Sequence, residues 1–293
     1  MRFIDYLDVS QHHLNLDLPI VAQEIKTSTD TETGLVRQSV TMKRYQGSYS
    51  SVISVKCDGS TVSVSGNPSR WGRPDNLYGL TTFEQCIQVY NTILISIGLP
   101  PFTKCTRFDW LQGSDGKKAT LTTDGALFSR VDWTRNFSVG KGNEKDFIRG
   151  ISSYSIGKGI KPFLYSNGHT VTWGGKGSLW YQKVYNKSED LRKNLKSQLK
   201  ANPHLPSEDK SYLQKLIEYC DQKGIVRDEK EFKSRLLRKE DLCFYGLTKE
   251  SDFNKYLTDI DKIIERIEMS TVDYVTISDQ LLDKRIVKSR QAA

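Results

Sequence analysis

Tyrosines and lysines alternate along residues 179–187 of the sequence. If this segment is a β-strand, its period of two places four side chains on one face, those of Tyr181, Lys183, Tyr185 and Lys187. A tyrosine that attacks a phosphodiester must lose a proton whose pKa is ordinarily about 10, and neighbouring lysines favour the phenolate while neutralising the phosphate. The segment is a candidate nucleophilic site, although an ordinary half-exposed strand face shows the same alternation.

Two further segments with strand character carry carboxylates at alternate positions. In residues 128–134, Asp132 shares a face with Arg130. In residues 225–237, the side chains that share a face are Arg227, Glu229, Glu231 and Lys233. If both strands lie beside the tyrosine strand, their carboxylates can hold a hard divalent cation that polarises the scissile phosphate. Surface salt bridges would account for each strand alone.

Strand pairs and helices alternate around these segments. We expect a hairpin of residues 52–56 and 61–64, a helix from Thr81 to about Gly98, and a strand over residues 126–139. A second hairpin over residues 171–187 precedes a helix that starts at Ser188, and further helices are expected over residues 147–155, 207–222 and 251–269.

The pattern predicts an α+β fold with a largely antiparallel central sheet, or sheets, flanked by helices. Residues 106–110 and 129–133 echo each other, which leaves open either two fused similar halves or chance.

Composition favours a folded protein with a polyanionic partner. Lys and Arg number 43 against 35 Asp and Glu, which gives a formal charge of +8. The five cysteines show no C-x-x-C spacing, so we expect reduced thiols and neither a disulfide framework nor a zinc module. The N-terminus lacks the apolar stretch of a signal peptide, and no apolar run is long enough to span a membrane, so a minor coat protein fits poorly.

Short motifs follow one another in a fixed order between residues 64 and 237. They are Gly-Asn-Pro-Ser-Arg at 66–70, Asp-Asn-Leu-Tyr-Gly at 75–79, Ser-Arg-Val-Asp-Trp-Thr at 129–134, Thr-Val-Thr-Trp at 170–173, Val-Tyr-Asn-Lys at 184–187, and Val-Arg-Asp-Glu at 226–229 followed by Lys233. In this order and spacing the sequence resembles the gene II/X replication endonucleases of filamentous phages, including the initiators of Vibrio phages of the CTX type. The resemblance implies a fold like that of the HUH endonucleases, which initiate rolling-circle replication.

The resemblance assigns roles to particular residues. The nicking tyrosine of the family lies in a Tyr-x-Lys segment and falls on Tyr185. Asp132 and Glu229 become the expected ligands of Mg²⁺ or Mn²⁺, with Lys187 and Lys233 beside the phosphate. The chain has four histidines and no His-x-His triplet, so a carboxylate-rich site must replace the histidine pair of HUH enzymes.

Basic residues supply the expected contacts to DNA. Arg70 and Arg73 lie beside Asn67 in a turn-rich segment, and Lys183 and Arg227 lie on the two candidate strands. The resemblance implies phage origin DNA as substrate, both duplex and locally unpaired. Trp71, Tyr78 and Trp180 are candidates to grip unpaired bases, although burial in the core explains each of them as well.

The function expected from the resemblance is that of a rolling-circle initiator. It would nick the phage origin through a 5′-phosphotyrosine intermediate, re-close the displaced strand, and work with the host helicase and polymerase in the cytoplasm of the bacterial host. Residues 1–240 would form the origin-binding and nicking domain, and residues 241–293 a C-terminal helical extension packed on it. The rival interpretation is an origin- or promoter-binding protein that does not cut DNA. A tyrosine recombinase is disfavoured because no His-x-x-Arg motif precedes the tyrosine.

Overall fold

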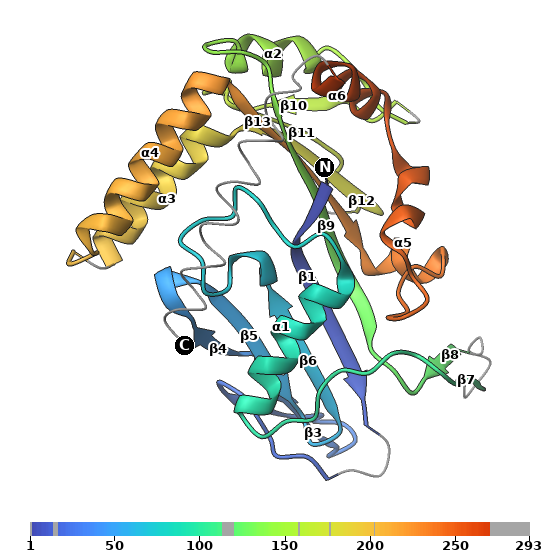
Figure 1. Ribbon diagram of the computed structural model, residues 1–293. Helices are drawn as coiled ribbons and strands as arrows, with labels where there is room; N and C mark the ends of the chain where they lie inside the picture. Colours follow the sequence, from blue (N-terminus) through green and yellow to red (C-terminus); the bar gives the residue numbers. More distant parts are fainter. Residues whose placement is uncertain are drawn as a thin grey trace.

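One continuous antiparallel sheet organises the chain. The computed structural model describes residues 2–13, 17–112, 120–157, 159–175, 177–201 and 203–269. Within these residues the sheet has nine strands in the order β10-β11-β12-β13-β9-β1-β6-β5-β4, and every pairing is antiparallel (Figure 1). The strands are β1 (Arg2–His12), β4 (Lys43–Gln46), β5 (Val52–Cys57), β6 (Thr61–Gly66), β9 (Leu127–Ser138), β10 (Pro162–Leu164), β11 (Thr170–Trp173), β12 (Trp180–Asn186) and β13 (Ile225–Lys233). The expected α+β class with a largely antiparallel sheet is confirmed.

Helices cover the two faces of the sheet unequally. They are α1 (Phe83–Ser96), α2 (Glu144–Ile151), α3 (Lys187–Ala201), α4 (Ser207–Lys223), α5 (Ser234–Lys239) and α6 (Asp259–Met269), with 3-10 turns at Ser48–Ser50, Pro68–Arg70 and Glu250–Tyr256. Helix α1 lies across β1, β5 and β6 (Figure 1), and α2, α5 and α6 bury apolar side chains against the same face. Helices α3 and α4 pack on the opposite face, around Ile225.

Strand β13 shows how the sequence separates the faces. Its even-numbered residues Val226 and Phe232 enter the apolar cores under α1, α2 and α6. Its odd-numbered residues include Arg227 and Glu229, which lie on the same face as Tyr185 of β12. We call this side of the sheet the tyrosine face. Helices α3 and α4 cover only one end of it, so most of it is polar and half-exposed.

Local signals placed several elements correctly. The hairpin of β5 and β6 and the central strand β9 agree with expectation. Helix α1 starts at the expected place, where the hydroxyl of Thr82 accepts from the backbone of Gln85 and the Gln85 side chain accepts in return.

Several boundaries differ from expectation, among them those of α2, which was expected over residues 147–155 and is found at Glu144–Ile151. Lys187 does not continue the tyrosine strand: helix α3 begins there, because the Asn186 side-chain oxygen accepts hydrogen bonds from Ser188 and Glu189. The strand expected to reach residue 237 ends at Lys233, where α5 follows. The helix expected over residues 251–269 is divided into a 3-10 turn and α6, because Thr258 hydrogen-bonds with Asp261 and begins the new helix.

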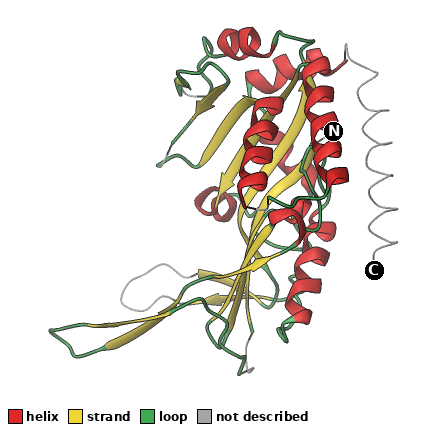
Figure 2. Cartoon of the chain, turned by 90° about the vertical axis from the view of Figure 1, so that its left-hand side faces the viewer, coloured by secondary structure: helices red, strands yellow, loops and turns green. Residues whose placement is uncertain are grey.

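Two small hairpins lie outside the main sheet. Strands β2 (Ile25–Thr29) and β3 (Val36–Val40) form an exposed arm that extends from the body (Figure 2), and β7 (Phe108–Leu111) pairs with β8 (Thr120–Thr123). Because β7 and β9 belong to different sheets, the echoing segments at 106–110 and 129–133 do not occupy equivalent positions, and they give no support to fused halves.

The described part of the expected C-terminal extension packs on the sheet. Phe253 lies in the core beneath α1, and Ile260 and Ile264 of α6 lie in the core beneath α2. Residues 270–293 lie outside the described residues. No helix among the described residues has both the length and the apolar character needed to cross a membrane.

Candidate active site

The order of the strands brings the tyrosine and carboxylate strands together. Strand β13 lies between β12 and β9. Lys183 is opposite Glu229, and Glu231 is opposite Asp132. Directly opposed residues share a face of the sheet, so both carboxylate strands present their acids on the same face as Tyr185, with β13 directly beside the tyrosine strand.

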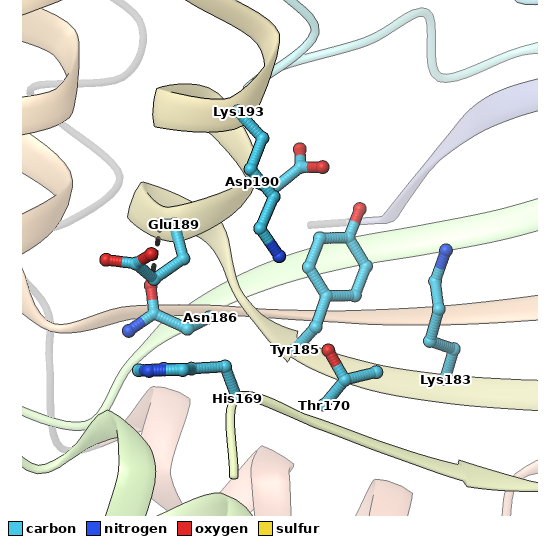
Figure 3. Close-up of a pocket in the computed structure, with 8 residues that line it drawn as sticks. All are labelled: His169, Thr170, Lys183, Tyr185, Asn186, Glu189, Asp190 and Lys193. Carbon is cyan, nitrogen blue, oxygen red and sulfur yellow. Dashed lines mark hydrogen bonds between the residues drawn. The ribbon is translucent and has the colours of Figure 1, made fainter. Parts of the chain in front are cut away.

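Tyr185 lies at the floor of a small pocket. Its hydroxyl donates a hydrogen bond of 3.1 Å to Oε2 of Glu229, and Nζ of Lys183 lies 3.0 Å from Oε1 of the same carboxylate. The Lys183 ammonium also lies 4.7 Å from the centre of the Tyr185 ring. The pocket, about 140 Å³ in volume, is lined by His169, Thr170, Lys183, Tyr185, Asn186, Glu189, Asp190 and Lys193 (Figure 3).

The surroundings keep Tyr185 protonated. Burial raises the pKa of Tyr185 well above its ordinary value, the charge of Glu229 raises it further, and the charge of Arg227 acts in the opposite direction. Burial alone would lower the pKa of Lys183, but the charge of Glu229 raises it, so this lysine stays cationic. A phenol is therefore held against a carboxylate that can accept its proton.

A second cation, Lys193, lies at the pocket, and the sequence alone did not identify it as an individual residue. Lys193 projects from α3, and Figure 3 shows its ammonium and that of Lys183 on opposite sides of the Tyr185 ring. No ion-pair partner of Lys193 occurs among the described residues, and the residue is exposed. The sequence shows only a scatter of Lys and Arg over residues 192–200, and it does not reveal which of them faces back toward β12.

Lys187, expected beside the phosphate, is fully buried. Its Nζ donates to Oδ1 of Asn76 at 3.0 Å and to Oδ2 of Asp190 at 2.6 Å. Burial lowers the pKa of Lys187, Arg227 lowers it further, and Asp190 opposes both. The lysine anchors the start of α3 to the segment around Asn76, and its direct contact with phosphate stays a prediction.

Arg227 is also buried, and the half-buried Asn67 makes contacts within the molecule. The Arg227 guanidinium donates to Oδ1 of Asn136 at 2.8 Å and to backbone carbonyls of Asn76 and Leu77. Asn67 donates to Asp5 at 2.9 Å and accepts from the backbone of Arg70, which starts a 3-10 turn. These contacts fix the turn-rich segment against the tyrosine face.

The two arginines of that segment make local contacts. Arg70 donates to the carbonyls of Arg73 and Tyr49, and Arg73 donates to the carbonyl of Ser69. At the other end of β13, Nζ of Lys233 donates to the carbonyl of Gly175 at 2.7 Å. The DNA and phosphate contacts expected of Arg70, Arg73 and Lys233 therefore stay predictions.

Asp132 lies close to other acids on the tyrosine face. Arg130 donates to both oxygens of Asp132, at 2.8 and 2.7 Å, and also lies 3.1 Å from Glu231. Even so, burial raises the pKa of Asp132 to about 7, with Arg130 lowering it and Glu229 and Glu231 raising it. One guanidinium is thus shared among several acids.

This donor set fits a hard divalent cation. Carboxylate and hydroxyl oxygens are the ligands that Mg²⁺ and Mn²⁺ prefer, and the Oγ1 atom of Thr134, opposite Glu229, is buried without a hydrogen-bond partner in the described part of the chain. Among the described residues, no group of three or more His, Cys, Asp or Glu side chains is arranged as a preformed metal site. To bind the ion, Asp132 would need to release Arg130, and Glu229 would need to release Lys183.

Comparison with known proteins decides the family. The model of the N-terminal part of the phage replication-associated protein, the product of filamentous-phage gene II, matches residues 4–255. The chain is also 40% identical over 245 residues to the replication-associated protein of Escherichia phage If1, covering 83% of this chain and 76% of that protein. The chain belongs to the gene II family of replication-associated proteins. The expected kinship with filamentous-phage gene II proteins is confirmed.

A solved structure of a rolling-circle replication initiator from Geobacillus stearothermophilus is a looser match to this gene II family chain. The alignment covers 82% of this chain and 76% of that one, with a TM-score of 0.33 and 11% identity. This likeness is too loose to transfer an active site. The family match, in contrast, spans every strand that bears a candidate residue.

Proposed function

We propose that this gene II family chain initiates rolling-circle replication by nicking one strand of phage origin DNA through a phosphotyrosine bond on Tyr185. The single observation that carries the proposal is the hydrogen bond to Glu229 from the hydroxyl of Tyr185, a residue that lines a pocket together with the cations Lys183 and Lys193. A nucleophile, a proton acceptor and phosphate-binding charges occupy one small site. Family membership supports a role in replication.

The chemistry follows from these positions. A phosphodiester enters the pocket with its non-bridging oxygens toward the ammonium groups of Lys183 and Lys193. The Tyr185 phenol gives its proton to Glu229 while its oxygen bonds to phosphorus, and the bond from phosphorus to the 3′ oxygen breaks. The leaving 3′ oxygen takes a proton from water. The products are a 5′-phosphotyrosine ester and a free 3′ hydroxyl.

Asp132 and Glu229 would hold the divalent cation, Mg²⁺ or Mn²⁺. When bound, the ion would supply charge that stabilises the transition state at phosphorus. Glu229 is on β13, between the strands that carry Tyr185 and Asp132, so it can serve both the tyrosine and the ion.

The ester retains the energy of the cleaved bond, so attack by a 3′ hydroxyl can re-close the displaced strand. In this proposal the first 3′ hydroxyl primes the host polymerase while the host helicase unwinds the duplex, in the cytoplasm of the bacterial host. Residues 1–240 carry the origin-binding and nicking activity, and residues 241–293 follow as a C-terminal extension, of which residues 270–293 lie outside the described part of the chain.

The test incubates the protein with supercoiled origin DNA, with and without Mg²⁺ or Mn²⁺, and scores nicks and covalent adduct. Tyr185→Phe should abolish both, whereas Tyr181→Phe, which removes the other tyrosine hydroxyl on the same strand face, should leave both within a fewfold of wild type. If the adduct persisted in Tyr185→Phe and vanished in Tyr181→Phe, Tyr181 would be the nucleophile. DNA binding without any cleavage, whatever the metal, would make the chain a non-catalytic origin-binding protein.

A further inference from the structure

Two exposed aromatic residues lie at the open edge of the tyrosine face. Strand β10 is the last strand on that side of the sheet. The Phe163 side chain is 63% exposed and that of Tyr165 is 44% exposed, and their rings meet edge to face with centres 5.2 Å apart. Their neighbour Leu164 instead packs toward the core beneath α2. Exposed rings that contact each other form a contiguous apolar surface, which is a feature of binding sites.

The strand register places these rings on the same face as the nucleophile. Phe163 is opposite Thr172, and Thr172 is opposite Lys183. The backbone of Tyr165 bonds to Thr170, which is opposite Tyr185 and lines its pocket. Since adjacent strands are about 4.8 Å apart, the rings begin roughly 10 Å from the nucleophile strand.

Positive charge accompanies the rings. Lys161 is exposed and, two residues before Phe163, continues the same alternation. The exposed Lys193 and half-exposed Lys183 lie at the pocket beyond. Alternating cations and aromatic rings are the combination that holds a single-stranded nucleic acid, with phosphates on the cations and bases stacked on the rings.

We propose that Phe163 and Tyr165 form a stacking platform for unpaired bases next to the scissile phosphate. This rests on the proposed function and deepens it: the strand that enters the Tyr185 pocket is single-stranded on the side of β10. Duplex DNA has its bases stacked inside, so it gains nothing from the rings. The platform thereby favours an origin whose strands have been separated.

The experiment measures affinity rather than cleavage, in the Tyr185→Phe background and without divalent metal. The probe is a fluorescent thymidine dodecamer, with a mixed-sequence duplex of equal length for comparison. Phe163→Ala and Tyr165→Ala should each weaken dodecamer binding by roughly five- to a hundredfold, and leave duplex binding within about twofold. Phe163→Tyr and Tyr165→Phe keep the rings and should bind as the parent does.

Two further comparisons separate stacking from charge and from folding. Loss of a ring should lower dodecamer affinity equally at all salt concentrations, whereas Lys161→Ala should reduce the salt slope by about one phosphate contact. Trp110→Ala removes a ring that is 70% exposed on β7, away from the main sheet, and should leave binding unchanged.

Unchanged dodecamer affinity in the double alanine variant would overturn the platform, as would equal losses for dodecamer and duplex. If that variant instead altered self-association in sedimentation, β10 would be a contact between copies of the chain. Neither result bears on the nucleophile, because the Tyr185→Phe nicking test is scored separately.

Discussion

The hydroxyl of Tyr185 and the carboxylate of Glu229 meet diagonally across two neighbouring strands. Tyr185 is opposite Arg227, and Glu229 is opposite Lys183, yet the phenol reaches Oε2 of Glu229 at 3.1 Å. Lys183 holds the other carboxylate oxygen at 3.0 Å, which fixes Glu229 in an accepting orientation. The proton of the candidate nucleophile thus has a defined acceptor before any substrate binds.

Glu229→Gln should reduce nicking by about 10²- to 10⁴-fold, because an amide can accept the hydrogen bond but cannot take up the proton. The measurement is the single-turnover rate of adduct formation at saturating origin DNA. Glu231→Gln is the matched control, because Glu231 is the next residue of β13 on the same face. This variant should reduce the rate of adduct formation by less than about tenfold. Equal losses in the two variants would argue against a specific proton acceptor.

Lys193→Ala should weaken binding of origin single strands and slow nicking by about tenfold or more, because it removes an exposed pocket cation without disturbing the core. Lys196→Ala, an exposed lysine on the same helix that does not line the pocket, is the control. The two variants should differ in nicking rate and in affinity for single strands, but they should have the same melting temperature. If the two variants had the same nicking rate and the same affinity, Lys193 would not be part of the phosphate site.

Millimolar Mg²⁺ or Mn²⁺ should raise the melting temperature of the wild-type protein, because an ion that binds only the folded state stabilises it, by about 2.7 kcal/mol at a hundred times its Kd. Asp132→Asn should abolish this gain, since it removes a buried carboxylate that is one of the two expected ion ligands. Thermal unfolding with and without metal provides the measurement. A gain that survives in Asp132→Asn would place the ion elsewhere.

Lys187→Ala should destabilise the fold by about 3–5 kcal/mol, because it strips a fully buried cation from Asp190 and Asn76. Denaturant unfolding measures the loss. Lys187→Met, which keeps the stem of the side chain, should lose less stability. The double variant Lys187→Met/Asp190→Asn should recover part of the stability that Lys187→Met loses. If Lys187→Ala were as stable as wild type yet inactive, Lys187 would act on the phosphate directly.

Asp261 should make the stability of the protein fall in acid. Burial would raise the pKa of Asp261, but Lys230, Arg2 and Arg135 lower it below its ordinary value. The unfolded chain therefore binds a proton at higher pH than the folded one, and this stabilisation is present above about pH 5 and is lost as pH falls below about 4. The stability difference between wild type and Asp261→Asn should be largest near pH 7 and shrink toward pH 3. A difference that stays constant with pH would contradict this role.

The sequence by itself determined the local framework of the site. Period-two alternation put Lys183 and Tyr185 on the same face of their strand. It also predicted the face that Asp132 and Glu229 each occupy on their own strands, because side-chain direction in a strand depends only on position along it. Turn and capping residues likewise placed the β5–β6 hairpin and the start of α1. The ordered motifs alone indicated the family.

The tertiary structure decided which faces meet and which charges are buried. Lys187 and Asn76 are 111 residues apart in sequence, and their contact converts an expected phosphate lysine into an internal anchor. Strand order set Glu229 beside Tyr185, turned Lys193 of α3 back over the pocket, and left Phe163 and Tyr165 at a free edge. These outcomes depend on pairing between distant segments, and local periodicity carries no information about which strands become neighbours.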